Sequence, residues 1–174
     1  MFQQHYTNPQ DVSNADMAAL AAATATIDVA AYSLTHPGII AALVARAHAG
    51  VKIRLYFDRI ELDAEARGNP ALTNSPLGAL LDAPNVQAKV KESTILMHLK
   101  SYLVDGKLLR DGSANFSPLG ESSQDNSMFL TDDGPTVALF AAKFTAMWNR
   151  PDNISPAQAV ASTHRQPAAT PHAH

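Results

Sequence analysis

Hydrophobic and polar residues alternate along the chain with two different periods. Residues 51–57 carry Val, Ile, Leu and Phe at every second position, with Lys, Arg and Tyr between them, and a period of two predicts a half-buried strand. Residues 37–49 and 135–150 instead place apolar side chains three or four positions apart, each after a proline suited to a first helical turn. This spacing predicts helices. We therefore expect alternating strands and helices.

The remaining elements follow from the same patterns. Further helices are predicted over 15–24 and 76–81, and further strands over 26–34, 86–90, 96–104, 107–110 and 127–131. Residues 59–75 show no periodicity, and a loop of that length in a compact domain is usually functional or mobile. From 151 onward the chain holds Pro, Ala, Ser and His without periodicity. The prediction is one domain over 10–150 and a disordered tail over 151–174.

Composition narrows the class of protein without identifying it. The 174 residues are 46% hydrophobic, which suits a single globular domain. The net charge of −3 gives no whole-protein reason to expect a nucleic acid or an anionic membrane, and the absence of cysteine excludes disulfides and thiolate metal sites. No run is apolar enough to span a membrane. The start does not read as a signal peptide, so we expect either a cytoplasmic protein or a bacterial periplasmic or secreted one whose targeting segment was removed.

The first chemically informative residues are a histidine and a lysine two positions apart. His98 and Lys100 fall in the predicted strand 96–104, so their side chains are expected on one face of it. A histidine ring nitrogen can form a covalent intermediate, and a lysine ammonium can neutralise a phosphate. The pair therefore suits cleavage of a phosphodiester bond.

A second cluster of polar residues follows shortly afterwards. Ser113 and Asn115 stand in the sequence Gly-Ser-Ala-Asn-Phe-Ser at 112–117 and can donate hydrogen bonds to the same phosphate. Asp125 could hold the second ring nitrogen of the histidine and select its tautomer. Taken alone, Ser113 and Asn115 could be turn residues with local backbone hydrogen bonds, but their position after Gly112 and the sum of the matching residues favour a site.

These residues carry a family resemblance. The pattern H-x-K-x-x-x-x-D at 98–105, followed by G-S-x-N-F-S at 112–117, resembles the HKD signature of the phospholipase D superfamily. Further similarity to its small single-motif bacterial endonucleases is found at 27–35, 50–54 and 147–149, and the resemblance covers about residues 10–150. It implies a single α/β domain with a mixed, largely parallel sheet flanked by helices on both faces.

The resemblance also implies a mechanism. His98 would attack phosphorus and form a phosphohistidine, with no metal or other cofactor. The motif occurs once, so the second histidine, which protonates the leaving oxygen, would come from the other subunit of a homodimer. Asp105 and Gly112 would be structural. Asp125 would orient the histidine, with Glu121 as the competing choice.

Local charge adds an expectation about substrate. Residues 86–110 contain five cationic residues and two acidic ones. Lys89 and Lys91 share one face of their predicted strand, and Arg54 and Arg59 could extend a groove that binds a nucleic acid. An ordinary solvated surface explains these charges equally well.

Three functions follow in order of preference. The first is a metal-independent nuclease that cleaves DNA with little sequence preference, with RNA left open as a substrate. The second is a phospholipase D-type lipid hydrolase or transferase, although such enzymes usually carry two motifs in one chain. The third is a non-catalytic nucleic-acid-binding module, against which the intact His98, Lys100 and Asn115 argue.

Overall fold

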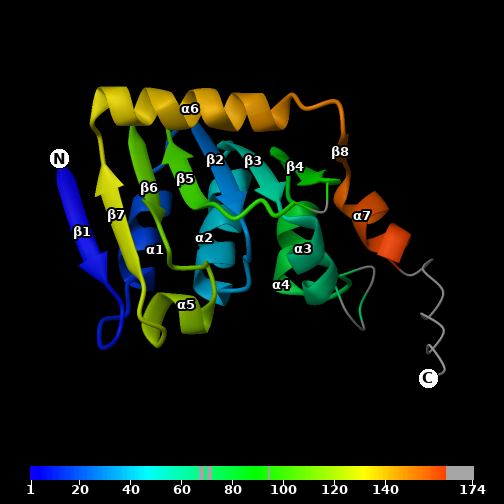
Figure 1. Ribbon diagram of the computed structural model, residues 1–174, viewed down its shortest axis with the longest axis horizontal. Coiled ribbons are helices and arrows are strands. Elements are labelled where there is room, and N and C mark those ends of the chain that lie inside the picture. The colour runs from blue at the N-terminus through cyan, green and yellow to red at the C-terminus, as the bar shows by residue number, and fades with distance from the viewer. Residues whose placement is uncertain (67–68, 70–71, 94, 164–174) are drawn as a thin grey trace, which may run out of the picture.

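One mixed β-sheet runs through the computed structural model, which describes residues 1–66, 69, 72–93 and 95–163. The strand order is β1-β7-β6-β5-β2-β3-β4-β8 (Figure 1). The strands are β1 Phe2–Tyr6, β2 Thr26–Ala31, β3 Lys52–Phe57, β4 Val86–Lys91, β5 Lys100–Val104, β6 Leu108–Gly112, β7 Ser127–Thr131 and β8 Asn153–Ile154. The helices are α1 Ser13–Ala21, α2 Pro37–His48, α3 Arg59–Glu65, α4 Pro76–Leu81, α5 Pro118–Ser122, α6 Gly134–Trp148 and α7 Pro156–Thr163.

The predicted α/β class, mixed sheet and helices on both faces are confirmed, but the prediction of a largely parallel sheet is wrong. Only β2–β3 and β3–β4 pair in parallel within the described sheet, because helices provide the crossovers between them. The other pairs are antiparallel. The Asp105-Gly106 turn joins β5 to β6 directly, and a connection this short can only reverse the chain.

Two hydrophobic cores lie on the two faces of the sheet. The larger one is buried under α1, α2, α3, α4 and α7. On the opposite face α6 lies across the strands (Figure 1) and packs Phe140, Phe144 and Trp148 against Ala30 and Tyr56. The helical spacing of apolar residues in α6 therefore describes the single stripe that meets the sheet.

Two of the predicted irregular segments contain regular structure. Residues 59–65 form α3, whose first turn is capped by the Asp58 carboxylate and whose Leu62 is buried. The predicted disorder from 151 is wrong for 153–163, because β8 pairs with β4 and α7 buries Ala159 and Val160. Both helices are too short for a clear sequence period. Residues 164–174 of the predicted tail lie outside the described residues.

The predicted start of the domain at residue 10 is also too late. β1 pairs antiparallel with β7 over Phe2–Tyr6 and forms one edge of the sheet. Its alternating pattern is weak because its side chains are mostly exposed, so no buried face marks it in the sequence.

Candidate active site

The two predicted clusters of polar residues meet at one edge of the sheet. β5 runs antiparallel to β2, so Lys100 at its start pairs with Ala31 at the end of β2. β6 returns along β5 and ends at Gly112, which brings Ser113 and Asn115 to the same edge. The sequence predicted this meeting by resemblance, and the alternating directions of β2, β5 and β6 produce it.

His98 lies just outside the regular strand that was predicted to carry it. β5 begins at Lys100, and the 96–99 segment has no regular structure. The predicted strand over 96–104 is therefore wrong for its first residues, and the two side chains do not share a face by strand geometry alone. The Lys100 ammonium instead donates to the His98 carbonyl oxygen at 2.8 Å. The His98 side chain is exposed, whereas Lys100 is buried.

Tyr32, which the sequence did not predict as a site residue, contacts both motif side chains. Its ring lies edge-on to the His98 ring with the centroids 4.4 Å apart, and the Lys100 Nζ lies 4.4 Å from the Tyr32 ring centroid. The Tyr32 backbone N–H donates to the Leu99 carbonyl oxygen at 2.9 Å. The end of β2 thus continues alongside the motif segment after regular pairing stops.

The environment of Lys100 changes its acidity. Burial lowers the pKa of Lys100 to about 8, although the nearby carboxylates Glu61 and Asp58 favour the charged form. Asp58 also accepts from the Met97 backbone N–H at 2.7 Å, so it anchors the segment before His98. A lysine that titrates near pH 8 can carry its charge at neutral pH while lying in a partly dehydrated site.

Glu121, the competing choice to orient His98, contacts Arg110 instead. It is fully buried, and its Oε1 lies 3.1 Å from an Arg110 nitrogen, while the Asp16 carboxylate lies 3.2 Å from the same guanidinium. Burial raises the pKa of Glu121 to about 9, and the negative charge of Asp16 adds to this. Glu121 is therefore part of a buried ion cluster, and this alternative for the orienting acid is wrong.

Asp125 and Ser113 lie together, and neither forms a hydrogen bond with His98 in the described chain. Asp125 accepts from the Asn8 side-chain amide at 3.1 Å. Ser113 Oγ donates to Asn126 Oδ1 at 3.0 Å and accepts from the Ser127 backbone N–H at the same distance. Both residues line a shallow pocket beside β1. In the described chain Asp125 therefore forms no hydrogen bond with the histidine that it was expected to orient.

Asn115 keeps an unused acceptor at the site. Its Oδ1 atom is buried and has no hydrogen-bond partner among the described residues, and a buried polar atom without a partner is uncommon. The backbone N–H groups of Thr35 and His36, in the connection from β2 to α2, donate to the Phe116 carbonyl oxygen and hold the residue that follows Asn115. Asn115 is thus held near the edge where Lys100 lies.

Only part of the predicted basic groove lies beside His98. Lys91 and His98 line one cavity of about 280 Å³ together with Lys143 and Arg150. Lys91 donates to the carbonyl oxygens of Ile95 and Leu96, so it also holds the segment before the motif. Arg59 donates at 3.1 Å to the carbonyl oxygen of Glu92, the residue that follows Lys91.

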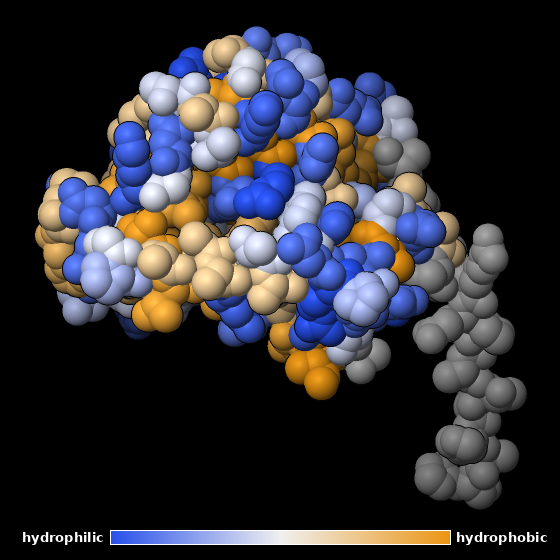
Figure 2. Space-filling view, turned by 90° about the horizontal axis from the view of Figure 1, so that it is seen from above, coloured by the Kyte–Doolittle hydropathy of each residue, from blue (hydrophilic) through white to orange (hydrophobic). Residues whose placement is uncertain are grey.

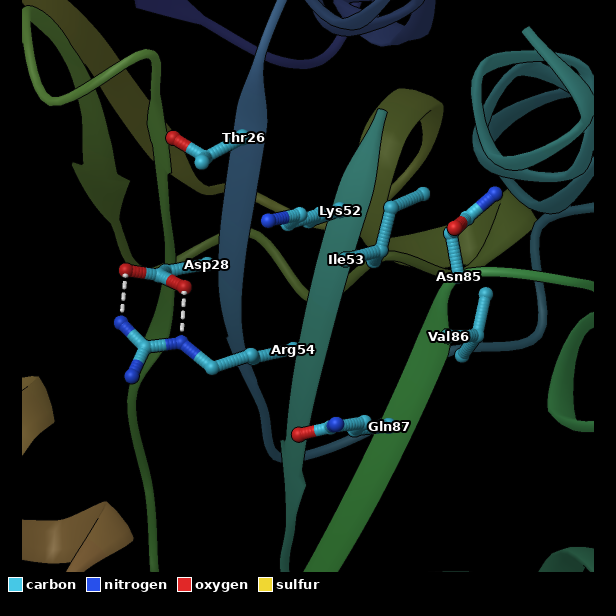
Figure 3. Close-up of a pocket in the computed structure, with 8 residues that line it drawn as sticks. All are labelled: Thr26, Asp28, Lys52, Ile53, Arg54, Asn85, Val86 and Gln87. Carbon is cyan, nitrogen blue, oxygen red and sulfur yellow. Dashed lines mark hydrogen bonds and ion pairs between the residues drawn. The ribbon is translucent and has the colours of Figure 1, made fainter. Parts of the chain in front are cut away.

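The other two predicted substrate cations have structural partners. Lys89 donates to the Trp148 carbonyl oxygen at 2.8 Å, at the end of α6. Arg54 forms a bidentate ion pair with Asp28, with N–O distances of 2.7 and 2.6 Å (Figure 3). Its guanidinium also lies over the Phe144 ring. The Asp28–Arg54 register lies toward the start of the parallel strands, opposite the edge that carries Lys100. The structure does not bring Arg54 to the site.

The pocket around this ion pair is a separate feature of the α6 side. It has a volume of about 480 Å³ and includes Lys52, Asn85 and Gln87 at the beginnings of β3 and β4 (Figure 3). Figure 2 shows the molecule from above α6, where hydrophilic side chains gather in a recess between apolar ones. The pocket of Figure 3 is lined by residues at the starts of β2, β3 and β4. Its position at the far end of the strands separates it from the motif.

Asp105 and Gly112 have clear structural contacts. The Asp105 carboxylate accepts from the backbone N–H groups of Thr24, Ala25 and Thr26 and from the Thr24 hydroxyl. Burial alone would raise the pKa of Asp105, but these hydrogen bonds outweigh it and lower the pKa to about 2. At Gly112, with φ +149°, a Cβ would lie 2.3 Å from the Ser127 carbonyl oxygen. Both residues maintain the backbone around the site.

Comparison with known proteins gives a consistent family. The family model described as "Cardiolipin synthase, PLD-like domain" matches residues 17–148. Mitochondrial cardiolipin hydrolase of Homo sapiens is 26% identical over 132 residues, which cover 76% of this chain and 49% of the relative. The Danio rerio protein of the same name is 26% identical over 133 residues, covering 76% and 55%. The chain spans about half the length of these curated relatives.

Solved structures agree in fold. NucT from Helicobacter pylori superposes with a TM-score of 0.72 at 22% identity, covering 89% of this chain and 99% of that one. Nuc from Salmonella typhimurium, titled a phospholipase D family member, gives a TM-score of 0.71 at 22% identity and covers 89% and 97%. At this identity the likeness concerns the fold, and both comparison chains are covered almost completely.

Proposed function

Since this chain belongs to the phospholipase D superfamily, we propose that it is a hydrolase that cleaves phosphodiester bonds in nucleic acids. The observation that carries the proposal is the convergence of His98, Lys100 and Asn115 at one sheet edge. DNA is the expected substrate, RNA stays open as a second one, and backbone recognition implies little sequence preference. The size and single motif shared with the small bacterial nucleases favour a nucleic acid over a lipid.

The chemistry follows from the residue types. A His98 ring nitrogen attacks phosphorus, the bond from phosphorus to the leaving oxygen breaks, and a phosphohistidine forms. Lys100 and Asn115 stabilise the negative charge on the other phosphate oxygens. A second His98 protonates the leaving oxygen and then activates the water that cleaves the phosphorus–nitrogen bond. No step requires a metal.

Because the motif occurs once, the second histidine requires a second chain. A two-fold axis beside His98 would place two copies of the site face to face in a homodimer. The exposure of His98, and of Ile95 and Leu96 just before it, is what such an arrangement would cover. In this assembly the exposed Asp125 of each chain would also be available to orient a histidine across the interface.

A lipid phosphodiesterase is the second candidate. Curated relatives carry the name mitochondrial cardiolipin hydrolase, and the cavity beside His98 combines cations with Leu96, Met97 and Met147. Over the described residues no helix is long and apolar enough to cross a membrane. A phospholipid headgroup would have to reach His98 from a membrane surface.

The deciding experiment measures cleavage of labelled single- and double-stranded DNA in excess EDTA. The native protein is compared with His98→Ala and with His48→Ala, which removes an exposed histidine at the end of α2. We expect cleavage and an acid-labile phosphoenzyme in the native and His48→Ala proteins, and neither in His98→Ala. Cleavage retained by His98→Ala would contradict the mechanism. Hydrolysis of cardiolipin vesicles without DNA cleavage would select the lipid alternative.

A further inference from the structure

Tyr32 occupies the space between the two motif side chains. Its ring meets the His98 ring edge-on, with 4.4 Å between the centroids, and its centroid lies 4.4 Å from the Lys100 Nζ. A ring placed in this way restricts rotation of an imidazole on one side and attracts an ammonium on the other. No other aromatic ring in the described chain has a ring contact with His98 or Lys100.

The segment that carries Tyr32 is itself held in place by α3. Burial raises the pKa of the Tyr32 hydroxyl, and the nearby Glu61 carboxylate of α3 raises it further. The Glu65 carboxylate accepts from the Ser33 hydroxyl and from the Leu34 backbone N–H, both at 3.1 Å. The residues on the carboxyl side of Tyr32 are therefore bonded to α3.

The same helix is tied to the motif segment. Asp58, which caps α3, accepts from the Met97 backbone N–H at 2.7 Å. α3 thus contacts the segment that carries Tyr32 and the segment that carries His98, and it fixes one relative to the other.

We propose that Tyr32, in a segment held by Glu65 of α3, is a positioning residue that sets the orientation of the His98 imidazole and keeps the Lys100 ammonium in the site. The inference rests on the proposed function, since it assigns a role within the same phosphodiester cleavage. Tyr32 touches no reacting atom itself. It acts through His98 and Lys100, with the face of its ring toward the cation.

Two substitutions separate this role from simple packing. Tyr32→Phe keeps the ring and loses only the hydroxyl, so we expect a loss of kcat of only a few-fold. Tyr32→Leu keeps apolar bulk and loses the ring, and because a misplaced reacting group costs about 100-fold, we expect kcat to fall by roughly that factor. KM should change little in both variants. Thermal unfolding of each variant checks that it folds.

A titration gives a readout that packing alone would not change. A ring face stabilises the ammonium, so its removal in Tyr32→Leu should lower the pKa of Lys100 by roughly half a unit or more. The Lys100 ¹³Cε resonance, followed by NMR against pH in the substrate-free protein, measures this directly. Tyr32→Phe should titrate like the native protein.

The outcomes divide clearly between the two proposals. Native-like kcat and an unchanged Lys100 titration in Tyr32→Leu would overturn the positioning role. Equal loss in Tyr32→Phe and Tyr32→Leu would also overturn it, since the hydroxyl and not the ring would then matter. If the native protein cleaves no nucleic acid, the proposed function fails, and the Lys100 titration alone still tests whether the ring holds the ammonium.

Discussion

Arg110 donates a hydrogen bond of 2.6 Å to the backbone carbonyl oxygen of Lys100. A second bond from the same nitrogen, of 3.0 Å, reaches the Ala114 carbonyl oxygen. One guanidinium therefore joins the strand that presents the lysine to the residue that precedes Asn115. Ion pairs with the buried Asp16 and Glu121 hold the guanidinium in this position.

Replacing Arg110 should destabilise the protein strongly. Arg110→Met removes both carbonyl contacts and leaves the Asp16 and Glu121 carboxyl groups buried without a cation, so we expect the free energy of unfolding to fall by about 3–5 kcal/mol. Urea unfolding measures it. Lys107→Met, an exposed change in the same hairpin, should cost less than about 0.5 kcal/mol. Equal losses in the two variants would show that the buried cluster contributes little.

Gly112 and Gly134 offer a matched pair of glycine substitutions. A Cβ at Gly112 would lie 2.3 Å from Ser127 O and 2.7 Å from Met128 Cα, while at Gly134 no atom beyond the two neighbouring residues lies within 4 Å. Gly112→Ala should force β6 away from β7, lower stability by about 2 kcal/mol or more, and reduce cleavage by displacing Asn115. Gly134→Ala, at the start of α6, meets only the adjacent Pro135 and should cost less than about 1 kcal/mol. Thermal unfolding and DNA cleavage of both variants provide the comparison.

Asp105 should make stability depend on pH in the acid range. Its folded-state pKa of about 2 lies below its ordinary value of 3.8, so its contribution is present above about pH 4 and is lost as pH falls toward 2. Asp105→Asn tolerates the positive φ of this position and should cost about 1–2 kcal/mol at pH 7. Urea midpoints of the two proteins should converge near pH 2. A constant difference from pH 7 to pH 2 would argue against the charged hydrogen bonds.

Lys100 should set the alkaline limit of cleavage. Burial lowers its pKa to about 8, and the neutral amine cannot neutralise phosphate charge. We expect kcat/KM, which reports groups of the free enzyme, to fall as pH rises through about 8. A profile from pH 6 to 10 measures this. Activity that stays constant to pH 10 would mean that the ammonium is not required or is not buried in solution.

Lys143 tests whether the cavity beside His98 carries substrate. Lys143→Met removes an exposed cation from that cavity, so it should weaken DNA binding and reduce the slope of log affinity against log salt by about one. Binding is measured by fluorescence anisotropy with His98→Ala as the background, which prevents cleavage. Lys52→Met, at the opposite sheet edge, should leave the slope unchanged. Equal effects of the two would indicate a diffuse electrostatic attraction.

Local patterns predicted the elements with one clear apolar face. β3 and α6 match the alternating run and the helical spacing closely, because each buries a single side against the sheet. α3 and α7 went unpredicted because each is short and held largely by contacts distant in sequence, such as those of Asp58 and Val160. A short segment contains too few residues to show a period.

In the candidate site, too, the sequence predicted some residues correctly and could not decide the role of others. His98, Lys100 and Asn115 were identified from their spacing, and the sheet topology brings them to one edge. Arg54 and Lys89 looked equally available in the sequence, but their charges are used by Asp28 and by the end of α6. Whether a cation faces substrate or a structural partner depends on the fold around it.

The amino-acid sequence alone determined the family, the order of its principal elements and the residue types that can cleave a phosphodiester, since motif spacing and periodicity are local properties of the chain. Only the tertiary structure decided the antiparallel character of the sheet, the burial of Glu121 against Arg110 and the place of Tyr32 between His98 and Lys100. These depend on which distant segments pair, and pairing is selected by packing and hydrogen bonding over the whole domain.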